Sequence, residues 1–169
     1  MILEIRKYGD PVLDRKAEPV TEFGPGLARL VDDMFETMYA APGVGLAAPQ
    51  VGVSRRLFVM DCSSNRDAAE RHVLVNPELL AREGKEKGDE GCLSFPGIFF
   101  EVERAARVVV RAQDVRGDWF ELDVTGLDSR CVQHENDHLD GVLFIQHLSA
   151  LRRDLVRRKI RKRQKAGDW

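Results

Sequence analysis

Apolar residues between Pro25 and Pro42 recur at the spacing of one helical face. Pro25 suits the first turn of a helix, and Pro42 disfavours helical backbone at the residue before it. The pattern therefore predicts a helix from Pro25 to about Ala40–Pro42, with its apolar stripe in the core. The stripe consists of Leu27, Leu30, Val31, Met34, Phe35 and Met38.

Shorter apolar stretches predict strands. Leu57–Met60 is a four-residue apolar run, and His72–Asn76 is a second run that ends before a proline. β-branched content rises between Glu101 and Ala112, and Trp119–Val124 alternates apolar and polar residues. Because Gly117 marks a turn between these last two segments, they are predicted to form a hairpin.

A further helix is predicted from about Gly126 to Leu139. Thr125 precedes it as an N-cap candidate, and Gly141 is a suitable C-terminal stop. Ser54–Arg56 and Ser63–Arg66 are typical loop material.

A last helix follows, with apolar positions at Leu148, Leu151, Leu155 and Ile160 and a strongly basic opposite face. Strands and helices do not alternate as βα units, which predicts an α+β fold. We expect small antiparallel β-sheets packed around a central helix, with an N-terminal and a C-terminal helix. Residues 1–148 would form one domain, and residues 149–169 its basic C-terminal helix.

Composition adds a charge asymmetry to this picture. The 169 residues include 43% apolar residues and carry a net charge of −2. Residues 150–169 hold nine Lys/Arg against two Asp, a local charge of +7, so the rest of the chain carries about −9. This indicates a polyanionic partner for the tail alone.

The remaining composition favours a reduced, cytoplasmic protein. The first residues lack the basic-then-apolar order of a signal peptide, and no apolar run approaches the length of a membrane span. Three cysteines is an odd count with no short-spaced pair, which is typical of free thiols. We therefore expect no membrane segment.

The pentad His134–His138 (HENDH) carries the clearest chemical signal. On a helix, His134 and His138 lie one turn apart on the same face, where two imidazoles can bind one metal ion. Glu135 between them can act on a metal-bound water. A catalytic site of this kind needs a third protein ligand.

The sequence patterns of known zinc proteases place the third ligand after the second histidine, and this chain has no match to them there. In the longer pattern His-Glu-x-x-His-x-x-Gly-x-x-His the final histidine would be residue 144, which is Phe144, and no glutamate follows His138. Three upstream cysteines remain as candidates. Cys62 ends an apolar strand and Cys131 fits a small buried position, whereas Cys92 lies in a stretch flanked by glycine and proline.

Three segments together resemble the peptide deformylase family. They are Gly43–Gly52 (GVGLAAPQVG), Glu90–Ser94 (EGCLS) and Gln133–Leu139 (QHENDHL), in the family's order. Tyr8–Leu13 (YGDPVL) is also similar to the family's start, so the resemblance covers about residues 1–147. Segments that occur together are far more specific than any one of them.

The resemblance implies that Cys92, His134 and His138 are the metal ligands, with the fourth position left for water. It further implies iron(II) as the metal, with zinc, nickel or cobalt able to take its place. The expected reaction releases formate from N-formylmethionyl peptides. Glu135 would move the proton of the water.

Other roles follow from matching motif positions. The resemblance implies that the Gln50 amide and the Leu93 backbone N–H stabilise the oxyanion, beside the tight wall at Gly45. Peptide substrate would add as a strand near Val44 and Gly91. The methionine side chain would lie among Val44, Glu90, Leu127, Arg130 and Cys131, although Arg130 is less apolar than such a wall requires.

The resemblance also suggests the ribosome as a partner of basic residues 152–165, and we expect no DNA partner. Two alternative functions are open to a chain with this sequence. Cleavage of an internal peptide bond would indicate a general metalloprotease. A catalytically silent metal-binding or ribosome-binding module is disfavoured, because such a protein has no chemical need of both Glu135 and Gln50.

Overall fold

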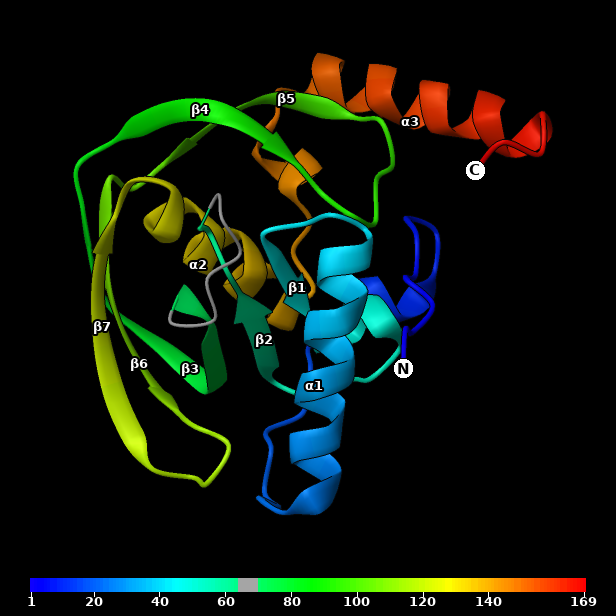
Figure 1. Cartoon of the computed structure of the whole chain (residues 1–169). Helices are drawn as coiled ribbons and strands as arrows, with labels where there is room; N and C mark the ends of the chain where they lie inside the picture. The colour runs from blue at the N-terminus through cyan, green and yellow to red at the C-terminus, as the bar shows by residue number, and fades with distance from the viewer. Residues whose placement is uncertain (64–69) are drawn as a thin grey trace.

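Two antiparallel sheets and three α-helices make up the fold, which the computed structural model describes for residues 1–63 and 70–169 (Figure 1). The helices are α1 (Pro25–Ala40), α2 (Gly126–Leu139) and α3 (Ala150–Lys165). The strands are β1 (Gly45–Ala47), β2 (Leu57–Met60), β3 (His72–Glu83), β4 (Glu86–Gly91), β5 (Phe99–Arg104), β6 (Arg107–Gln113) and β7 (Trp119–Thr125). Short 3₁₀ helices lie at Pro11–Asp14, Ala48–Val51 and Phe144–His147. The predicted α+β class is confirmed.

The helix α2 lies between the two sheets. The larger sheet has the order β1-β2-β3-β6-β7, and β4 pairs with β5 in a separate two-stranded ribbon. Helix α2 packs against β1, β2, β6 and β7, and the β4–β5 ribbon arches over it (Figure 1). Ten of the fourteen α2 residues are buried, so side chains placed on this helix are withdrawn from bulk water.

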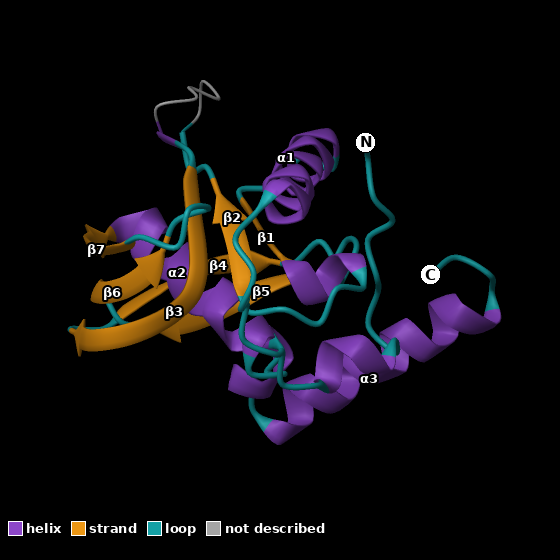
Figure 2. Ribbon diagram, turned by 90° about the horizontal axis from the view of Figure 1, so that it is seen from below, coloured by secondary structure: helices purple, strands orange, loops and turns teal. Residues whose placement is uncertain are grey.

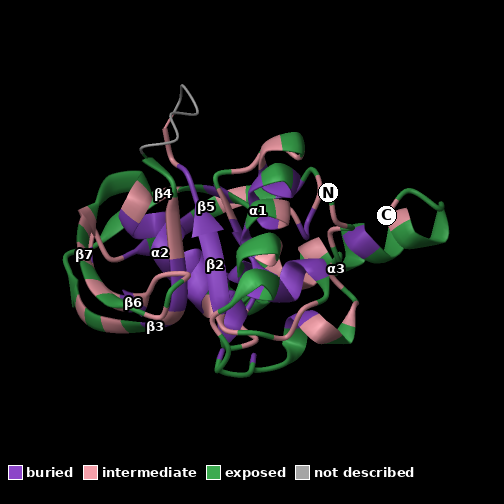
Figure 3. Ribbon diagram, turned by 60° about the horizontal axis from the view of Figure 1, so that its bottom comes forward, coloured by how far each residue is buried: buried purple, intermediate pink, exposed green. Residues whose placement is uncertain are grey.

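The predicted amphipathic helix is confirmed as α1. Its stripe residues Leu27, Val31, Met34, Phe35 and Met38 are buried. They form one core cluster with residues of β1 and β2, and Figure 3 shows the buried positions gathering there and on α2. Burial of such a stripe, rather than intrinsic propensity, supplies most of the stability of a short helix.

The predicted hairpin is also confirmed, because β6 and β7 pair in register from Arg107–Thr125 to Gln113–Trp119. The region between Glu101 and Ala112 is divided between β5 and β6, which belong to different sheets. Thr125 holds the N-cap position of α2 but makes no side-chain capping hydrogen bond.

Strand β3 is longer than the sequence pattern predicted. The strand continues past Pro77 to Glu83, because register shifts between Val75 and Glu78 accommodate the proline. Of the predicted loop at Ser63–Arg66, residues 64–66 lie outside the described part of the chain.

The helix α3 projects from the body toward the side where both termini lie (Figure 2). It is fixed to the body by buried Ile160 and by Arg163, whose Nη1 donates to the Pro96 carbonyl at 2.6 Å. The Trp169 Nε1 donates to the Tyr8 carbonyl at 3.0 Å. Within the described part of the chain, none of the helices combines the length and the apolar character that crossing a membrane requires.

Candidate metal centre

The helix α2 places His134 and His138 on one buried face. Their ring centroids lie 5.1 Å apart. Burial lowers the pKa of His138 well below its usual value, which favours the neutral imidazole that binds metals. Two ligands at the spacing i and i+4 on a rigid helix therefore face the same point.

The third donor comes from the end of strand β4. Cys92 directly follows β4, and its Sγ lies 3.4 Å from His138 Nε2. One ligand atom from each of Cys92, His134 and His138 falls within 4.8 Å of the others. A thiolate and two imidazoles at this spacing fit a tetrahedral divalent cation whose fourth position remains open.

A buried carboxylate orients the first histidine. The Nδ1 of His134 lies 2.8 Å from Glu90 Oε1, so donation to this carboxylate leaves Nε2 available as the metal ligand. Burial alone raises the pKa of Glu90. Hydrogen bonds from Arg104 and His134 outweigh burial and hold that pKa well below its ordinary value, so Glu90 stays ionised.

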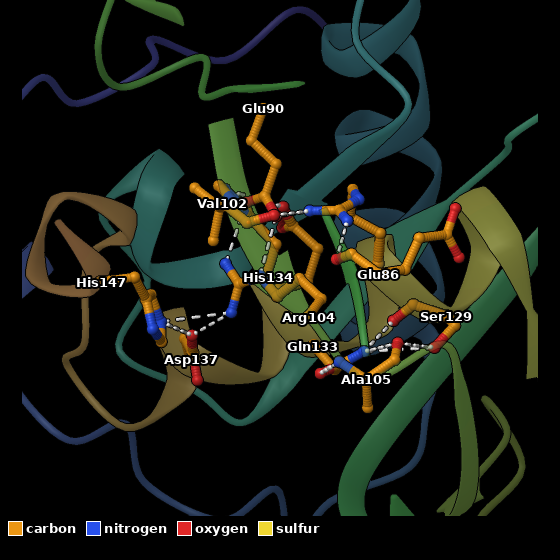
Figure 4. A network of polar contacts seen from close by, with 12 residues as sticks. Glu86, Glu90, Val102, Arg104, Ala105, Ser129, Gln133, His134, Asp137 and His147 are labelled. Carbon is orange, nitrogen blue, oxygen red and sulfur yellow. Dashed lines mark hydrogen bonds and ion pairs between the residues drawn. The ribbon is translucent and has the colours of Figure 1, made fainter. Parts of the chain in front are cut away.

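Glu90 belongs to a larger network of charges (Figure 4). Arg104 donates to both oxygens of Glu90, at 2.8 and 2.9 Å, and its Nη1 donates to Asp137 Oδ2 at 2.8 Å. Asp137 in turn lies 2.9 Å from His147 Nε2. Arg130 also donates to Glu90, at 2.7 Å. The network ties β4 and β5 to α2 around the metal ligands.

Glu135 is buried beside the three ligands. Its Oε1 lies 3.8 Å from His134 Nε2, and its Oε2 has no hydrogen-bond partner among the described residues. Burial raises the pKa of the Glu135 carboxyl to about 7. The group therefore has an unsatisfied acceptor at the site and can take up or release a proton near neutral pH.

Gln50 presents a fixed donor to the same place. Its Oε1 accepts from the Ala47 backbone N–H at 2.9 Å, which sets the orientation of the amide. Its Nε2 then lies 3.2 Å from Ser94 Oγ and 3.6 Å from Cys92 Sγ. Because Gln50 is only 1% exposed, its amide is buried and held in one orientation beside Cys92.

A cleft of about 620 Å³ opens in front of the triad. Of the residues for which sequence analysis predicted a role, its lining includes Val44, Gly45, Glu90, Gly91, Cys92, Leu93, Leu127, Arg130, Cys131, His134 and Glu135. Gln50 and His138 join the site through their contacts with Cys92. The structure thus brings all the predicted residues to one place. Cys131 is also part of the core.

Glycine at position 45 permits close packing of β1 against α2 beside the cleft. A Cβ at Gly45 would lie 2.7 Å from Cys131 Sγ and 3.0 Å from Glu135 Cγ. Strand β1 therefore approaches α2 more closely than any larger residue allows.

Sequence reasoning missed the partners that lie behind the ligands. Arg104 comes from β5 and carries no local signal, and Ser94 was seen only as part of a motif. Asp137 lies within the helical motif, and an acid three residues after a metal ligand could have been noted as a second-layer candidate. Its partner His147 lies beyond the helical motif and carries no local signal of this role.

The α+β fold, the Cys/His/His triad and the adjoining carboxylate define a metal-dependent hydrolase. The family model for polypeptide deformylase matches residues 2–154. A peptide deformylase of Acidobacterium capsulatum is 59% identical over 169 residues, covering 100% of this chain and 99% of the relative. One from Chromobacterium violaceum is 49% identical over 97% of each chain.

Solved structures of peptide deformylases are also similar to this chain. The crystal structure of a peptide deformylase from Legionella pneumophila has a TM-score of 0.92 and 46% identity, covering 99% of this chain and 98% of that one. That of Synechococcus elongatus in complex with actinonin has a TM-score of 0.88 and 40% identity, over 93% and 86% of the two chains. The chain belongs to the polypeptide deformylase family. It is a metal-dependent peptide deformylase, which removes the N-formyl group from nascent peptides.

Proposed function

We propose that Cys92, His134 and His138 hold the metal for this reaction and that Glu135, Gln50 and Leu93 carry out its proton transfer and charge stabilisation. The observation that carries the proposal is the partnerless Glu135 Oε2, buried next to the three ligand atoms. A carboxylate placed there without a structural partner has a chemical use as a proton acceptor.

When bound, a divalent cation acts as a Lewis acid that activates water and polarises the formyl carbonyl. Glu135 accepts the proton of the attacking water and returns it to the leaving amine. As the formyl carbon becomes tetrahedral, its oxygen gains negative charge. The Gln50 amide and the Leu93 backbone N–H donate to that oxygen, and the bond from Ala47 holds Gln50 in place beforehand.

The substrate is an N-formylmethionyl peptide that lies extended in the cleft. Val44 directly precedes β1 and Gly91 is the last residue of β4, and both border the cleft, so their backbone can pair with the peptide as an added strand. Val44, Leu127 and Cys131, with the stem of Arg130, offer apolar surface for the methionine side chain. Gly45 keeps β1 close to the reacting groups.

Iron(II) is the metal we propose, with zinc, nickel or cobalt able to replace it. One thiolate and two imidazoles suit each of these ions. An iron(II)–thiolate centre is sensitive to oxygen, so the iron-loaded protein should lose activity in air faster than the nickel-loaded protein. Equal lifetimes of the two forms would argue against iron as the native metal.

The remaining proposals concern the setting of the reaction. Residues 1–148 act as one metallohydrolase domain, and residues 149–169 form its basic C-terminal helix. The basic residues of 152–165 dock on ribosomal RNA, which brings the cleft to chains still being made. The protein works in the cytoplasm, where translation occurs.

Formate release from formyl-Met-Ala-Ser tests the assignment of Glu135. With protein purified anaerobically in iron(II), Glu135→Ala should lower kcat by about 100-fold or more, while the metal content stays at one ion per chain because Glu135 is not a ligand. Activity that survives the substitution would refute the proposed proton transfer. Loss of the metal in Glu135→Ala would instead show that the carboxylate supports binding.

A further inference from the structure

Arg130 lines the cleft where an apolar wall is needed, and its guanidinium is bonded to the β4–β5 ribbon. The Arg130 Nη1 donates to Glu90 Oε2 at 2.7 Å and to the Val102 carbonyl at 2.8 Å. Its Nη2 donates to the Glu86 carbonyl at 2.8 Å. These acceptors belong to β4 and β5, so the guanidinium is held against the two-stranded ribbon and the side chain is only 10% exposed.

The guanidinium fits there because position 88 has no side chain. A Cβ at Gly88 would lie 3.1 Å from Arg130 Nη2 and 3.2 Å from both Cζ and Nε. Gly88 is not among the glycines with positive φ, so the backbone does not require glycine at this position. Gly88 also lies on the same side of β4 as Glu86 and Glu90, and this side faces Arg130.

We propose that Gly88 and Arg130 together determine how far the first side chain of the substrate enters the cleft. Gly88 provides the space that keeps the guanidinium outside the pocket, and the aliphatic stem of Arg130 then forms the pocket wall. The inference rests on the proposed function, since it concerns the methionine side chain of a formylated peptide.

The physical basis is the two-part nature of the arginine side chain. Its methylene stem covers apolar surface while its head needs polar partners. Glu90 and two backbone carbonyls of the ribbon satisfy the head, so the stem can face the substrate without leaving an unpaired charge in the wall. A wall of this kind accepts an unbranched apolar side chain of limited length.

The test compares two substrates, formyl-Met-Ala-Ser and formyl-Ala-Ala-Ser. The alanine methyl does not reach the wall, so the ratio of the two kcat/KM values reports the pocket and cancels both the folded fraction and any damage to the metal site. In Gly88→Ala the added methyl displaces the guanidinium toward the pocket. The ratio should fall about tenfold in favour of the alanine substrate. Gly26→Ala, a position with nothing within 4 Å of the added atom, is the matched control and should leave the ratio unchanged.

Removing the guanidinium should reverse the effect. In Gly88→Ala combined with Arg130→Met, the ratio should return to within about threefold of the wild-type value, because the methionine lacks the group that collides. An unchanged ratio in Gly88→Ala, or a ratio that stays low in the double variant, would overturn the proposal.

Arg130→Met alone provides a second route if Gly88→Ala does not fold. It opens the space beside Gly88, so kcat/KM for formyl-2-aminoheptanoyl-Ala-Ser should rise about tenfold relative to the methionine substrate. No such rise would count against the proposal. Failure of the proposed function looks different, because wild-type protein would then release formate from none of these peptides.

Discussion

Gly45 of β1 lies directly against the side chain of Glu135. We expect Gly45→Ala to lower kcat about 100-fold, because the added methyl would lie 3.0–3.1 Å from Glu135 Cγ and Cδ and must move that carboxylate. The same crowding against Cys131 should lower the free energy of unfolding by about 1–3 kcal/mol. Formate release and urea unfolding measure the two effects. A Gly45→Ala protein with wild-type kcat would show that Glu135 does not need its observed position.

Gln50 offers a second test at a single atom. In Gln50→Glu the acceptor for the Ala47 N–H is kept, but the donor beside Cys92 is replaced by a carboxylate oxygen. Loss of one oxyanion donor costs about 100-fold to 1000-fold in kcat, so we expect a fall of that size with little change in KM. Metal analysis must accompany the kinetics, since a carboxylate near Cys92 can also alter metal binding. Undiminished kcat with full metal content would exclude Gln50 as the donor.

Part of the site could be predicted from the residues themselves, because His134, Glu135 and His138 share one short helical motif. The residues left Cys62, Cys92 and Cys131 open as the third ligand, and only the resemblance of three segments to the deformylase family implied Cys92. The residues behind the ligands could not be predicted in this way, since Arg104 comes from a distant strand and is recognisable only by its contacts. The interpretation of Arg130 was incomplete for the same reason. The sequence shows the charge of Arg130, but it does not show that Gly88 lies beside the guanidinium and leaves space for it.

At the level of elements, the β4–β5 ribbon is joined to α2 largely through buried charges. Arg104 bridges Glu90 of β4 and Asp137 of α2, and its side chain is only 4% exposed. Arg104→Lys keeps the charge but cannot reproduce the two-pronged contact with a carboxylate. We expect the free energy of unfolding to fall by about 2 kcal/mol and metal affinity to fall at least tenfold, because Glu90 orients His134.

Denaturant unfolding and metal competition with a chelator measure these two quantities. Arg107→Lys is the matched control, since Arg107 contacts Glu83 and Asp123 on the exposed side of the sheet, and it should change neither quantity appreciably. If Arg104→Lys lowered stability but left metal affinity intact, the ribbon would have no part in orienting the ligand.

The same ribbon explains which elements the sequence could predict. Helix α1 buries one face, β6 buries every second residue and β7 alternates between half-buried and exposed residues, so the periodicity of each segment predicts its structure. Strand β4 reads Glu-Lys-Gly-Asp-Glu-Gly and buries only Glu90. It is a strand because β5 pairs with it along its length. A local sequence pattern does not show which segment a strand will pair with. The predicted strand ends before Pro77, whereas β3 continues to Glu83, because the sequence does not reveal the register shift that accommodates the proline.

At the scale of the whole molecule, charge is separated between an acidic body and the basic helix α3. Helix α3 is anchored to the body that carries the cleft. Its residue Ile160 is buried, and Trp169 Nε1 donates a hydrogen bond to the Tyr8 carbonyl near the start of the chain. Deleting α3 and the residues after it would remove Ile160 and Trp169 from the core cluster that contains Phe95, whose ring lies 6.5 Å from that of Trp169. A sound test of ribosome docking must remove charge while leaving the helix in place.

Exposed basic side chains of α3 allow such a test. We expect the combined substitution of Arg157, Arg158, Arg161 and Lys162 by glutamine to weaken co-sedimentation with ribosomes and to flatten its dependence on salt, because each lost phosphate contact removes about one released counterion. Glutamine retains helix propensity, so the fold and formate release from a short peptide should not change. The matched control is the same number of glutamines at Arg29, Lys85, Lys87 and Arg116 on the body. Equal weakening in both variants would mean that net charge alone governs binding, and that α3 is not a docking element.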